Sequence, residues 1–344
     1  MNGTYVLKKP KGLSNFRLKV MLSFVAVLCI LCLPMTLMAA DAVVLKFASH
    51  QPTNSYLNHW AKIFIEQVNK DVDGAKIEFL GGPEVVPPFE AMKYINRGTV
   101  DLYLGTPGFF AGAIPVGLAS YNIFASSATL RTTDFFTMMD KIHREKGVAI
   151  LGDLGRGGNL GCFLKNPLEK ADFSGLKLRT IPHLNPLVTS LGGSPVTTSP
   201  AEVYSALERG VVDGFLYPQG TGIIETKWYE VVDYVVDPMI PYTGCLFVMA
   251  NAKKWDSISQ SIQEQIMSIL IEMENQSWQW NKDDSEKALN KLYESGELKV
   301  SKLPKGEAEK YSAVAKDSLW KLIISKDSKN GPKFKEIGEK VSIQ

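Results

Sequence analysis

Apolar and polar residues follow two different periods along the chain. The run V-V-L-K-F-A-S at 43–49 and the run A-K-I-E-F-L at 75–80 predict strands. Between them, residues 56–69 carry apolar side chains at helical spacing, which predicts a helix after a turn-rich loop at 50–55. The apolar positions of that helix are Leu57, Trp60, Ala61, Phe64 and Val68. In open α/β sheets, ligands bind where such a loop leaves the carboxyl end of a strand.

One α/β unit occurs twice in the sequence. Residues 90–101 read E-A-M-K-Y-I-N-R-G-T-V-D, and residues 202–213 read E-V-Y-S-A-L-E-R-G-V-V-D. Each copy predicts the end of a helix, a glycine stop and a buried strand. A duplicated unit predicts two similar lobes, and two facing lobes form a cleft suited to a small molecule.

The two copies differ in the strand that precedes them. The first copy follows a strand that ends in Glu78 and Phe79, whereas the second follows a strand that ends in Arg179. After Arg179 the chain has room for an added short helix at 185–191, which Gly192 and Gly193 end. The asymmetry therefore lies directly beside the predicted cleft.

The second half of the chain adds longer elements. A strand is expected at 245–250, and a long helical stretch follows at 257–295, which could run across both lobes. The lysine-rich tail contains one clear helix around 310–325. Because no low-complexity linker separates the lobes, we expect the chain to cross between them more than once, as in a hinge.

The first 40 residues predict export. They hold five basic residues and no acidic one, then an apolar run over 20–37, then M-A-A-D-A at 38–42. This is the pattern of a secretory signal peptide, cleaved after Ala40 or Ala42; the alternative is an uncleaved membrane anchor. Without residues 1–40 the formal charge of +2 becomes slightly negative, so there is no general case for nucleic-acid binding. We expect a periplasmic protein.

Few residues suit catalysis. The four histidines lack metal-ligand spacing, and there is no H-E-x-x-H, G-x-S-x-G or Walker motif. The glycines at 155–161 have the spacing G-x-G-x-x-x-G, which favours a crossover between lobes over a nucleotide site. Cys162 and Cys245 could form a disulfide or stay as buried thiols. We therefore expect a binding protein without metal or cofactor. A secreted enzyme would need a nucleophile–base pair or a metal site.

Arg179 is the strongest candidate for ligand contact. An arginine at the carboxyl end of a strand, at the edge of a cleft, is suited to a bidentate grip on a carboxylate. The helix that follows would place its amino terminus nearby, which also favours an anion. From spacing alone, the alternative of a surface arginine in a local salt bridge is favoured over ligand contact.

Several ordered motifs resemble one known family. They are F-S-G-L-K-L-R at 173–179, L-G-G-S-P-V at 191–196, A-E-V-Y-S-A-L-E-R-G-V-V-D-G at 201–214, the segment 81–101, and K-W-Y-E-V-V-D-Y at 227–234. Together they are similar to the signature of TRAP-type solute-binding proteins, the receptors of tripartite ATP-independent periplasmic transporters. The match covers most of residues 43–300.

The resemblance implies a two-lobed α/β fold, like that of type II periplasmic binding proteins, with hinge strands and a long helix that spans the lobes. We place lobe I at 43–156 plus 245–284 and lobe II at 157–244 plus 285–335. The resemblance also implies that the protein closes on a small organic acid, whose carboxylate Arg179 clamps, and delivers it to TRAP permease subunits. The same fold could instead serve an ABC importer or a sensor kinase. We expect a monomer.

The sequence departs from the family pattern at two positions. Some members carry a second arginine on the strand before G-L-K-L-R, where this chain has Asn159 with Arg156 slightly upstream, and an asparagine where it has Tyr217. One arginine, a tyrosine hydroxyl and nearby aromatic residues suit a smaller or more apolar monocarboxylate better than a sugar acid. Further wall candidates follow strands, each with a structural alternative as a core, turn or capping residue: His50, Gln51, Asn54, Glu84, Thr106, Phe109, Tyr121 and Trp228.

Overall fold

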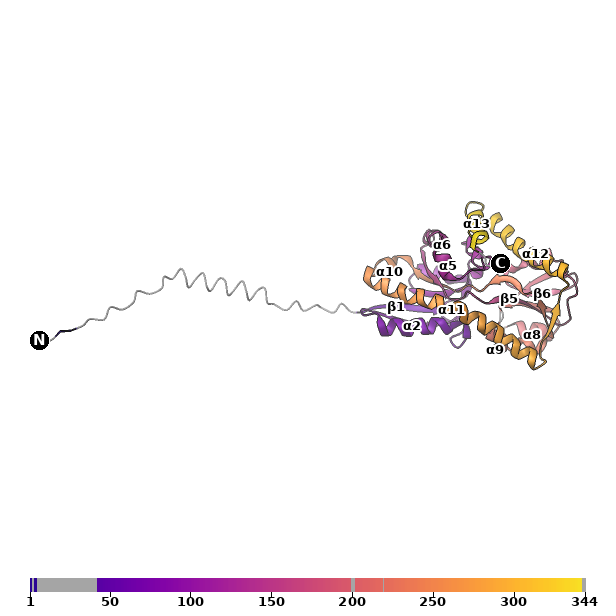
Figure 1. The fold of residues 1–344 in the computed structure, drawn as a ribbon, viewed down its shortest axis with the longest axis horizontal. Coiled ribbons are helices and arrows are strands. Elements are labelled where there is room, and N and C mark those ends of the chain that lie inside the picture. Colours follow the sequence, from indigo (N-terminus) through magenta and orange to yellow (C-terminus); the bar gives the residue numbers. More distant parts are fainter. Residues whose placement is uncertain (2, 5–41, 199–201, 219, 342–344) are drawn as a thin grey trace. The chain divides into compact units, whose positions relative to one another are not determined.

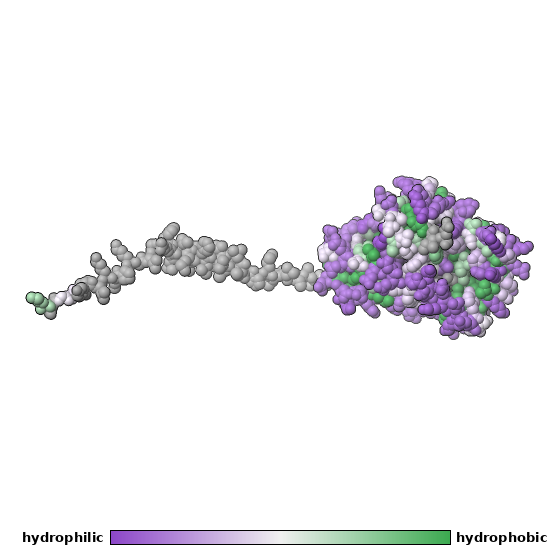
Figure 2. Space-filling view, viewed as in Figure 1, coloured by the Kyte–Doolittle hydropathy of each residue, from purple (hydrophilic) through white to green (hydrophobic). Residues whose placement is uncertain are grey.

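Two β-sheets organise residues 42–341 (Figure 1). The computed structural model describes residues 1, 3–4, 42–198, 202–218 and 220–341. The predicted signal peptide and its cleavage positions lie almost entirely outside these residues, so they stay a prediction. On the face in Figure 2, hydrophilic residues cover most of 42–341, and apolar residues form small separate patches.

The first sheet has five strands in the order β2-β1-β3-β11-β4. Strand β1 is parallel to β2 and β3, while β11 is antiparallel to both β3 and β4. The bounds are β1 Val43–Ser49, β2 Ala75–Gly81, β3 Leu102–Gly105, β4 Val148–Asp153 and β11 Phe247–Asn251. Around it lie α2 His59–Asp71, α3 Ala91–Asn96, α4 Ala119–Asn122, α5 Ser127–Arg131, α6 Phe135–Arg144 and α10 Ala252–Asp256.

The second sheet has seven strands, with β12-β9-β5-β8-β6-β7 in order and β10 paired to β5. Strand β6 is parallel to β7 and β8, while β5 is antiparallel to β8. The bounds are β5 Asn159–Leu164, β6 Lys177–Thr180, β7 Ser194–Thr197, β8 Gly214–Pro218, β9 Tyr234–Asp237, β10 Ile240–Thr243 and β12 Lys299–Lys302. The short helices here are α7 Asn185–Ser190, α8 Val203–Glu208 and α9 Thr221–Thr226.

Strand alternation divides the buried side chains among three cores. Phe47 and its neighbour Ala48 enter different cores, as do Leu102 and Tyr103, because successive side chains of a strand point to opposite faces. In the second sheet, Phe163 and Leu164 divide in the same way. Both faces of each sheet are therefore covered, which confirms the predicted α/β class.

The duplicated segments occupy equivalent places in the two sheets. The strand after each copy, β3 or β8, lies between a parallel strand and an antiparallel one. Gly98 and Gly210, which end the two helices, have φ of 69° and 70°, a conformation that glycine adopts without steric cost.

The repeated aspartates fix the register of the paired strands. Asp101 accepts a hydrogen bond from the Lys46 amide at 2.9 Å, and Asp213 accepts one from the Lys177 amide at 2.8 Å. Each aspartate also donates its own backbone amide to the carbonyl of the same lysine at 2.8 Å. The internal repeat is thus a structural unit with the same physical role in both sheets.

Two short segments, at 154–158 and 244–246, carry the chain between the sheets. They are hydrogen-bonded to each other, from the Leu154 amide to Leu246 at 3.0 Å and from the Gly244 amide to Gly158 at 2.9 Å. A Cβ on Gly244 would lie 2.2 Å from the Gly155 carbonyl oxygen, so this close approach requires glycine. Two of the predicted lobe boundaries, 156/157 and 244/245, lie in these crossings, whereas the third, 284/285, lies inside the helix at 260–294. We propose that each sheet is the centre of one lobe.

Helix α11, Gln260–Glu294, is 35 residues long and begins at the Ser259 cap, which accepts a hydrogen bond from Ile262. It contacts α2, α5 and β4 beside the first sheet and α9 beside the second (Figure 1). Buried Glu274 anchors it by accepting bonds from Arg131 Nε at 2.6 Å and the Asp153 amide at 2.8 Å. The predicted lobe-spanning helix is therefore present.

The carboxyl-terminal segment differs from the prediction. It contains two helices, α12 Lys305–Lys326 and α13 Gly331–Val341, instead of one. Both pack on the core that the two sheets share, through Tyr311, Trp320 and Phe334. The predicted helix at 56–69 is also divided, into a 3-10 turn at Tyr56–Asn58 and then α2.

The register bonds give a direct test of the duplicated unit. We expect Asp101→Ala to lower the free energy of unfolding by about 1–3 kcal/mol, because it leaves the Lys46 amide, in a partly buried bond, without its acceptor. Asp213→Ala should lower it by about 0.5–1.5 kcal/mol, because the bond to the Lys177 amide is exposed and water can replace it. The matched control is Asp73→Ala, which removes an exposed carboxylate and should change the value by less than about 0.5 kcal/mol. Urea unfolding measures all three. Equal stability of the three variants would contradict the role of the repeat.

Candidate functional site

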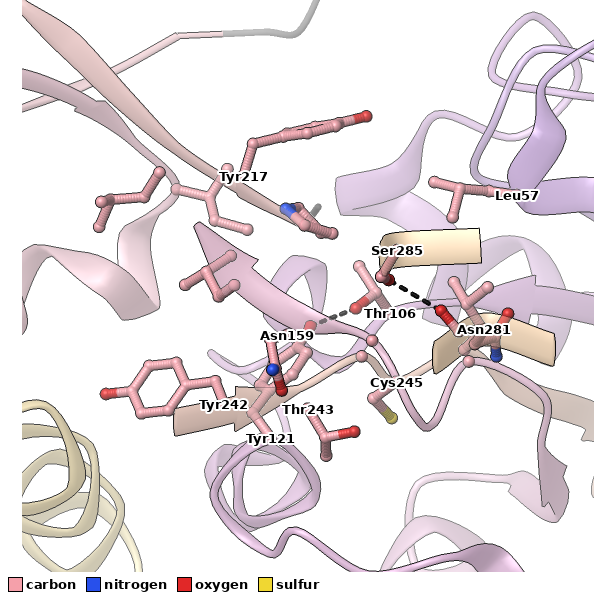
Figure 3. A pocket seen from close by; sticks show the side chains of 18 of the residues that line it. Leu57, Thr106, Tyr121, Asn159, Tyr217, Tyr242, Thr243, Cys245, Asn281 and Ser285 are labelled. Carbon is pink, nitrogen blue, oxygen red and sulfur yellow. Dashed lines mark hydrogen bonds between the residues drawn. The ribbon is translucent and has the colours of Figure 1, made fainter. Parts of the chain in front are cut away.

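A pocket lies where the strand ends of both sheets meet the crossing segments (Figure 3). Its volume is about 150 Å³, the size of a cavity that can hold a molecule such as benzene. The first sheet supplies the loops after β1 and β3, and the second supplies the ends of β6 and β8. Parallel neighbours such as β1 and β3, or β6 and β8, bring their carboxyl ends to one edge, which is why the pocket lies there.

Arg179 is a buried cation in the pocket wall. Its side chain is 2% exposed, and it donates from Nη2 at 2.9 Å and from Nε at 3.3 Å to the Thr198 carbonyl. Among the described residues, no carboxylate forms an ion pair with it. Burial lowers the pKa of Arg179 to about 10, so the guanidinium is still charged at neutral pH. A buried charge without a counter-charge is costly unless an anion joins it.

Tyr217 lies beside Arg179 and gives the wall a neutral donor. Burial raises the pKa of Tyr217 to about 12, although Arg179 opposes the rise, so the hydroxyl keeps its proton at neutral pH. The ring packs against Trp228 at 4.6 Å between centroids, and Trp228 also lies 5.9 Å from the guanidinium. Trp228 itself is 3% exposed and belongs to the core beneath the pocket.

The opposite wall combines aromatic rings with neutral polar groups. Tyr121 stacks on His183, with centroids 4.7 Å apart and the planes within 1°, and its hydroxyl bonds to the Thr106 hydroxyl and to the Gly108 amide (Figure 3). His50 lies 5.7 Å from the ring of Phe109. Burial lowers the pKa of His183 to about 3 and that of His50 to about 4. Both imidazoles are therefore neutral at pH 7.

The structure places the sequence candidates in two groups. Those that line the pocket are His50, Gln51, Thr106, Phe109, Tyr121, Asn159, Arg179 and Tyr217. Those that do not are Asn54, Glu84, Arg156 and Trp228. Whether the first group contacts a ligand stays a prediction, because the pocket lining describes position alone.

Arg156 clamps the chain beside the crossing instead of facing the pocket. It is 1% exposed, and it donates to the carbonyls of Ala125 at 2.6 Å and Ser120 at 3.2 Å, and also to that of Ile123. Its Nη1 pairs with Asp153 at 3.2 Å. These bonds hold the end of α4 and the residues after it, 120–125, beside Asp153 at the end of β4.

Glu84 and Asn54 lie at the surface. The Glu84 carboxylate turns back to accept the Gly82 amide at 2.6 Å, and this bond lowers the pKa of Glu84. Asn54 is exposed, and Ser55 instead caps the 3-10 turn by accepting from the Leu57 amide at 3.3 Å. Of the two cysteine alternatives, the structure has buried free thiols at Cys162 and Cys245, and Cys245 lines the pocket.

Sequence reasoning missed the part of the wall that distant elements supply. These residues are Tyr56, His183, Tyr242, Thr243, Asn281, Asp284 and Ser285. Asn281 and Ser285 project from α11 (Figure 3), and His183 follows β6. The polar residues of α11 that line the pocket look like any solvent-exposed helix face in the sequence. No signal there distinguished Asn281, Asp284 and Ser285 from exposed positions of the same helix.

The described part of the chain contains neither a metal-binding cluster nor a membrane-spanning helix. There, no group of three or more His, Cys, Asp or Glu is placed to hold a metal ion. Nor does any helix within those residues have the length and apolarity needed to cross a membrane.

Comparison with known proteins decides the family. The model for bacterial extracellular solute-binding proteins of family 7, DctP, matches residues 46–327. The chain belongs to this family. The family consists of solute-binding receptors and not of enzymes, which confirms the TRAP-type resemblance of the sequence.

Two periplasmic binding proteins align in sequence with more than half of the chain. A C4-dicarboxylate-binding periplasmic protein of Rhodobacter capsulatus is 24% identical over 289 residues, which cover 80% of this chain and 85% of the relative. A 2,3-diketo-L-gulonate-binding periplasmic protein of Escherichia coli is 26% identical over 212 residues, covering 59% of this chain and 63% of the relative.

Solved structures of an extracytoplasmic solute receptor and of a TRAP periplasmic solute-binding protein have a similar fold. A Bordetella pertussis extracytoplasmic solute receptor, described as binding pyroglutamic acid, superposes with a TM-score of 0.75 at 17% identity and covers 87% of this chain and all of its own. A Desulfovibrio salexigens TRAP periplasmic solute-binding protein with bound orotic acid has a TM-score of 0.76 at 18% identity, covering 86% and 97%. The two-lobed fold predicted from the sequence is thereby confirmed.

The neutral histidines of the site predict how stability depends on pH. The pKa of His183 is lowered in the folded protein, so the unfolded state binds more protons below about pH 6.5 and stability falls as the pH decreases. Between pH 7 and pH 5, His183 should account for a loss of about 2 kcal/mol. His183→Phe keeps a ring against Tyr121 but has no imidazole to protonate. Between pH 7 and pH 5, its free energy of unfolding should therefore fall by about 2 kcal/mol less than that of the wild type.

Urea unfolding at the two pH values measures the difference. The control is His59→Phe, because the His59 ring is only partly buried and its smaller lowering of pKa should give a smaller effect. An identical pH dependence of the wild type and His183→Phe would show that the buried imidazole is not held neutral.

Proposed function

We propose that this receptor closes on a small organic acid in the pocket between the two sheets and delivers it to the membrane subunits of a TRAP transporter. The observation that carries the proposal is Arg179, a buried guanidinium in the pocket wall without an ion-pair partner among the described residues. A carboxylate is the planar anion that a guanidinium binds with two parallel hydrogen bonds. Its arrival would supply the counter-charge that the buried cation lacks.

The composition of the wall favours a monocarboxylate. Arg179 is the one lysine or arginine among the described residues that line the pocket, so a second carboxylate would have no such partner. The adjacent hydroxyl of Tyr217 is a neutral donor. Apolar side chains supply much of the remaining wall, namely Leu57, Phe109, Leu160, Ile181, Leu184, Leu216 and Leu246. The acids named for the relatives, pyroglutamic and orotic among them, are in keeping with an acid ligand and do not identify this one.

Contacts across the pocket mouth support closure as the working motion. Tyr56, from the loop after β1, donates its amide to Glu225 of α9 at 3.3 Å. Its ring lies so close to Gly222 that a Cβ there would approach Tyr56 Cε1 to 2.5 Å. We infer that this contact joins the lobes in the closed state, which ligand stabilises through differential contacts.

The arginine is tested by a conservative substitution. Arg179→Lys keeps the charge but not the planar fork, so we expect affinity for the bound acid to fall at least tenfold. Arg97→Lys, on the exposed end of α3, is the control and should bind as the wild type does. Isothermal titration calorimetry measures both, with acids first chosen from a thermal-shift panel of monocarboxylates, dicarboxylates and sugar acids.

Unchanged affinity in Arg179→Lys would show that Arg179 does not bind the carboxylate of the ligand. Stabilisation by dicarboxylates or sugar acids alone would contradict the monocarboxylate class. Delivery is tested separately, by uptake of the acid into cells that express the receptor with a candidate pair of TRAP membrane subunits. No transport ATPase of an ABC importer is expressed with them. Uptake that does not require those subunits would contradict the proposed partner.

Closure is tested at a residue outside the pocket lining. Gly222→Ala places a methyl group against the Tyr56 ring and should weaken binding of the same acid severalfold by disfavouring the closed state. Gly306→Ala is the control, because a Cβ there meets nothing within 4 Å. Small-angle scattering with and without the acid should show compaction in the wild type and in Gly306→Ala, but less in Gly222→Ala. Equal compaction in all three would show that this contact does not set the closed state.

A further inference from the structure

A carboxylate also lines the pocket. Asp284 of α11 belongs to the wall that contains Arg179. It accepts hydrogen bonds from the Thr221 hydroxyl at 2.5 Å and from the Thr221 amide at 3.0 Å, one on each oxygen. A carboxylate oxygen has two lone pairs, so each oxygen keeps one acceptor position beyond these bonds.

Asp284 has no cationic partner among the described residues. No lysine, arginine or histidine there forms an ion pair with it, and Arg179, in the same wall, does not pair with it either. His59 is the titratable base that senses Asp284, but burial lowers the pKa of His59 despite that carboxylate. The imidazole is therefore mostly neutral at pH 7 and leaves the negative charge uncompensated.

Two tyrosines connect the two charges. Tyr217 lies beside Arg179, and Tyr56 interacts electrostatically with both Tyr217 and Asp284. A Cβ built on Gly220 would lie 2.7 Å from Asp284 Oδ2 and 3.7 Å from the Tyr56 hydroxyl. Arg179, the two phenols and Asp284 therefore belong to one pocket wall.

A purely structural role for Asp284 explains only part of this arrangement. Its two bonds to Thr221 join α11 to the first turn of α9 and use one acceptor position on each oxygen. They bring no cationic side chain to Asp284, although it lines a pocket whose one arginine is also without an ion-pair partner among the described residues. Two opposite charges in one pocket, each without a counter-charge among the described residues, fit a ligand that brings both.

We propose that the acid is zwitterionic: an amino acid whose carboxylate lies against Arg179 and whose ammonium group is accepted by Asp284. The apolar wall, including Leu160, Ile181 and Leu216, would take an apolar side chain. This inference rests on the proposed function and narrows its ligand class. Neutral His50 and His183 leave the pocket without a further cation to repel the ammonium group.

Matched pairs of acids test the inference. Calorimetry compares L-leucine with 4-methylpentanoate, L-phenylalanine with 3-phenylpropanoate, and 4-aminobutanoate with butanoate, so that the amine is the variable within each pair. In the wild type, we expect at least one amine-bearing member to bind tenfold or more tightly than its partner. In Asp284→Asn that ratio should fall to near one, through weaker binding of the amine-bearing member alone.

Two control variants separate charge from structure. Asp283→Asn makes the same change one position earlier on α11, where the carboxylate bonds to Gln279, and should keep the wild-type ratio. Thr221→Val removes the hydroxyl donor to Asp284 but not its charge, and should also keep the ratio. If Asp284→Asn does not fold by circular dichroism, the ratio in the wild type still decides the question.

Three results would overturn the inference. Equal or tighter wild-type binding of the deaminated acids would contradict the ammonium site and leave the carboxylate clamp standing. Equal weakening of both members of a pair by Asp284→Asn would show that Asp284 acts through structure alone. Failure of every acid in both series to bind would contradict the proposed monocarboxylate function together with the zwitterion.

Discussion

The unpaired charge of Arg179 is the constraint on which the site depends. The sheet buries this guanidinium at the end of β6 and gives it one backbone carbonyl, from Thr198, as a partner. Burial without a carboxylate disfavours the charged form, as the lowered pKa of Arg179 shows. Arg156 is equally buried but is satisfied by three carbonyls and Asp153. Arg156 therefore holds parts of the chain together, whereas Arg179 is the position at which we propose that an anion binds.

The duplicated unit explains how the chain can build a pocket around such a residue. Asp101 and Asp213 fix the same pair of strands in each sheet, so the carboxyl ends of β1 and β3 in one sheet and of β6 and β8 in the other arrive at the crossings. Two short segments and α11 then connect the sheets. Few segments cross, as in a hinge, and the core that contains Tyr311, Trp320 and Phe334 packs against both sheets.

Local pattern predicted the elements that local interactions determine. The strand at 43–49 and the long helix near 257–295 could be read from periodicity, and Arg179 from its place at the end of a strand. The sequence predicted a strand from 245, but β11 begins at Phe247. Periodicity could not show this difference, because the Leu246 amide bonds to the Asp153 side chain at the crossing. Nor could it show the approach of Tyr56 to α9, or of Asp284 to the pocket, since these contacts join segments far apart in the chain. The role of Arg156 could not be predicted either, because the three carbonyls that it binds lie about 30 positions earlier in the chain.

The most direct test of the account is the identity of the small molecule that the purified receptor carries. Mass spectrometry of material released by denaturing the wild type should find a small organic acid with one carboxylate, and the same acid should be depleted from Arg179→Lys prepared in parallel. A neutral or purely cationic compound, or equal amounts of one acid in both preparations, would contradict the claim that the unpaired guanidinium selects the ligand.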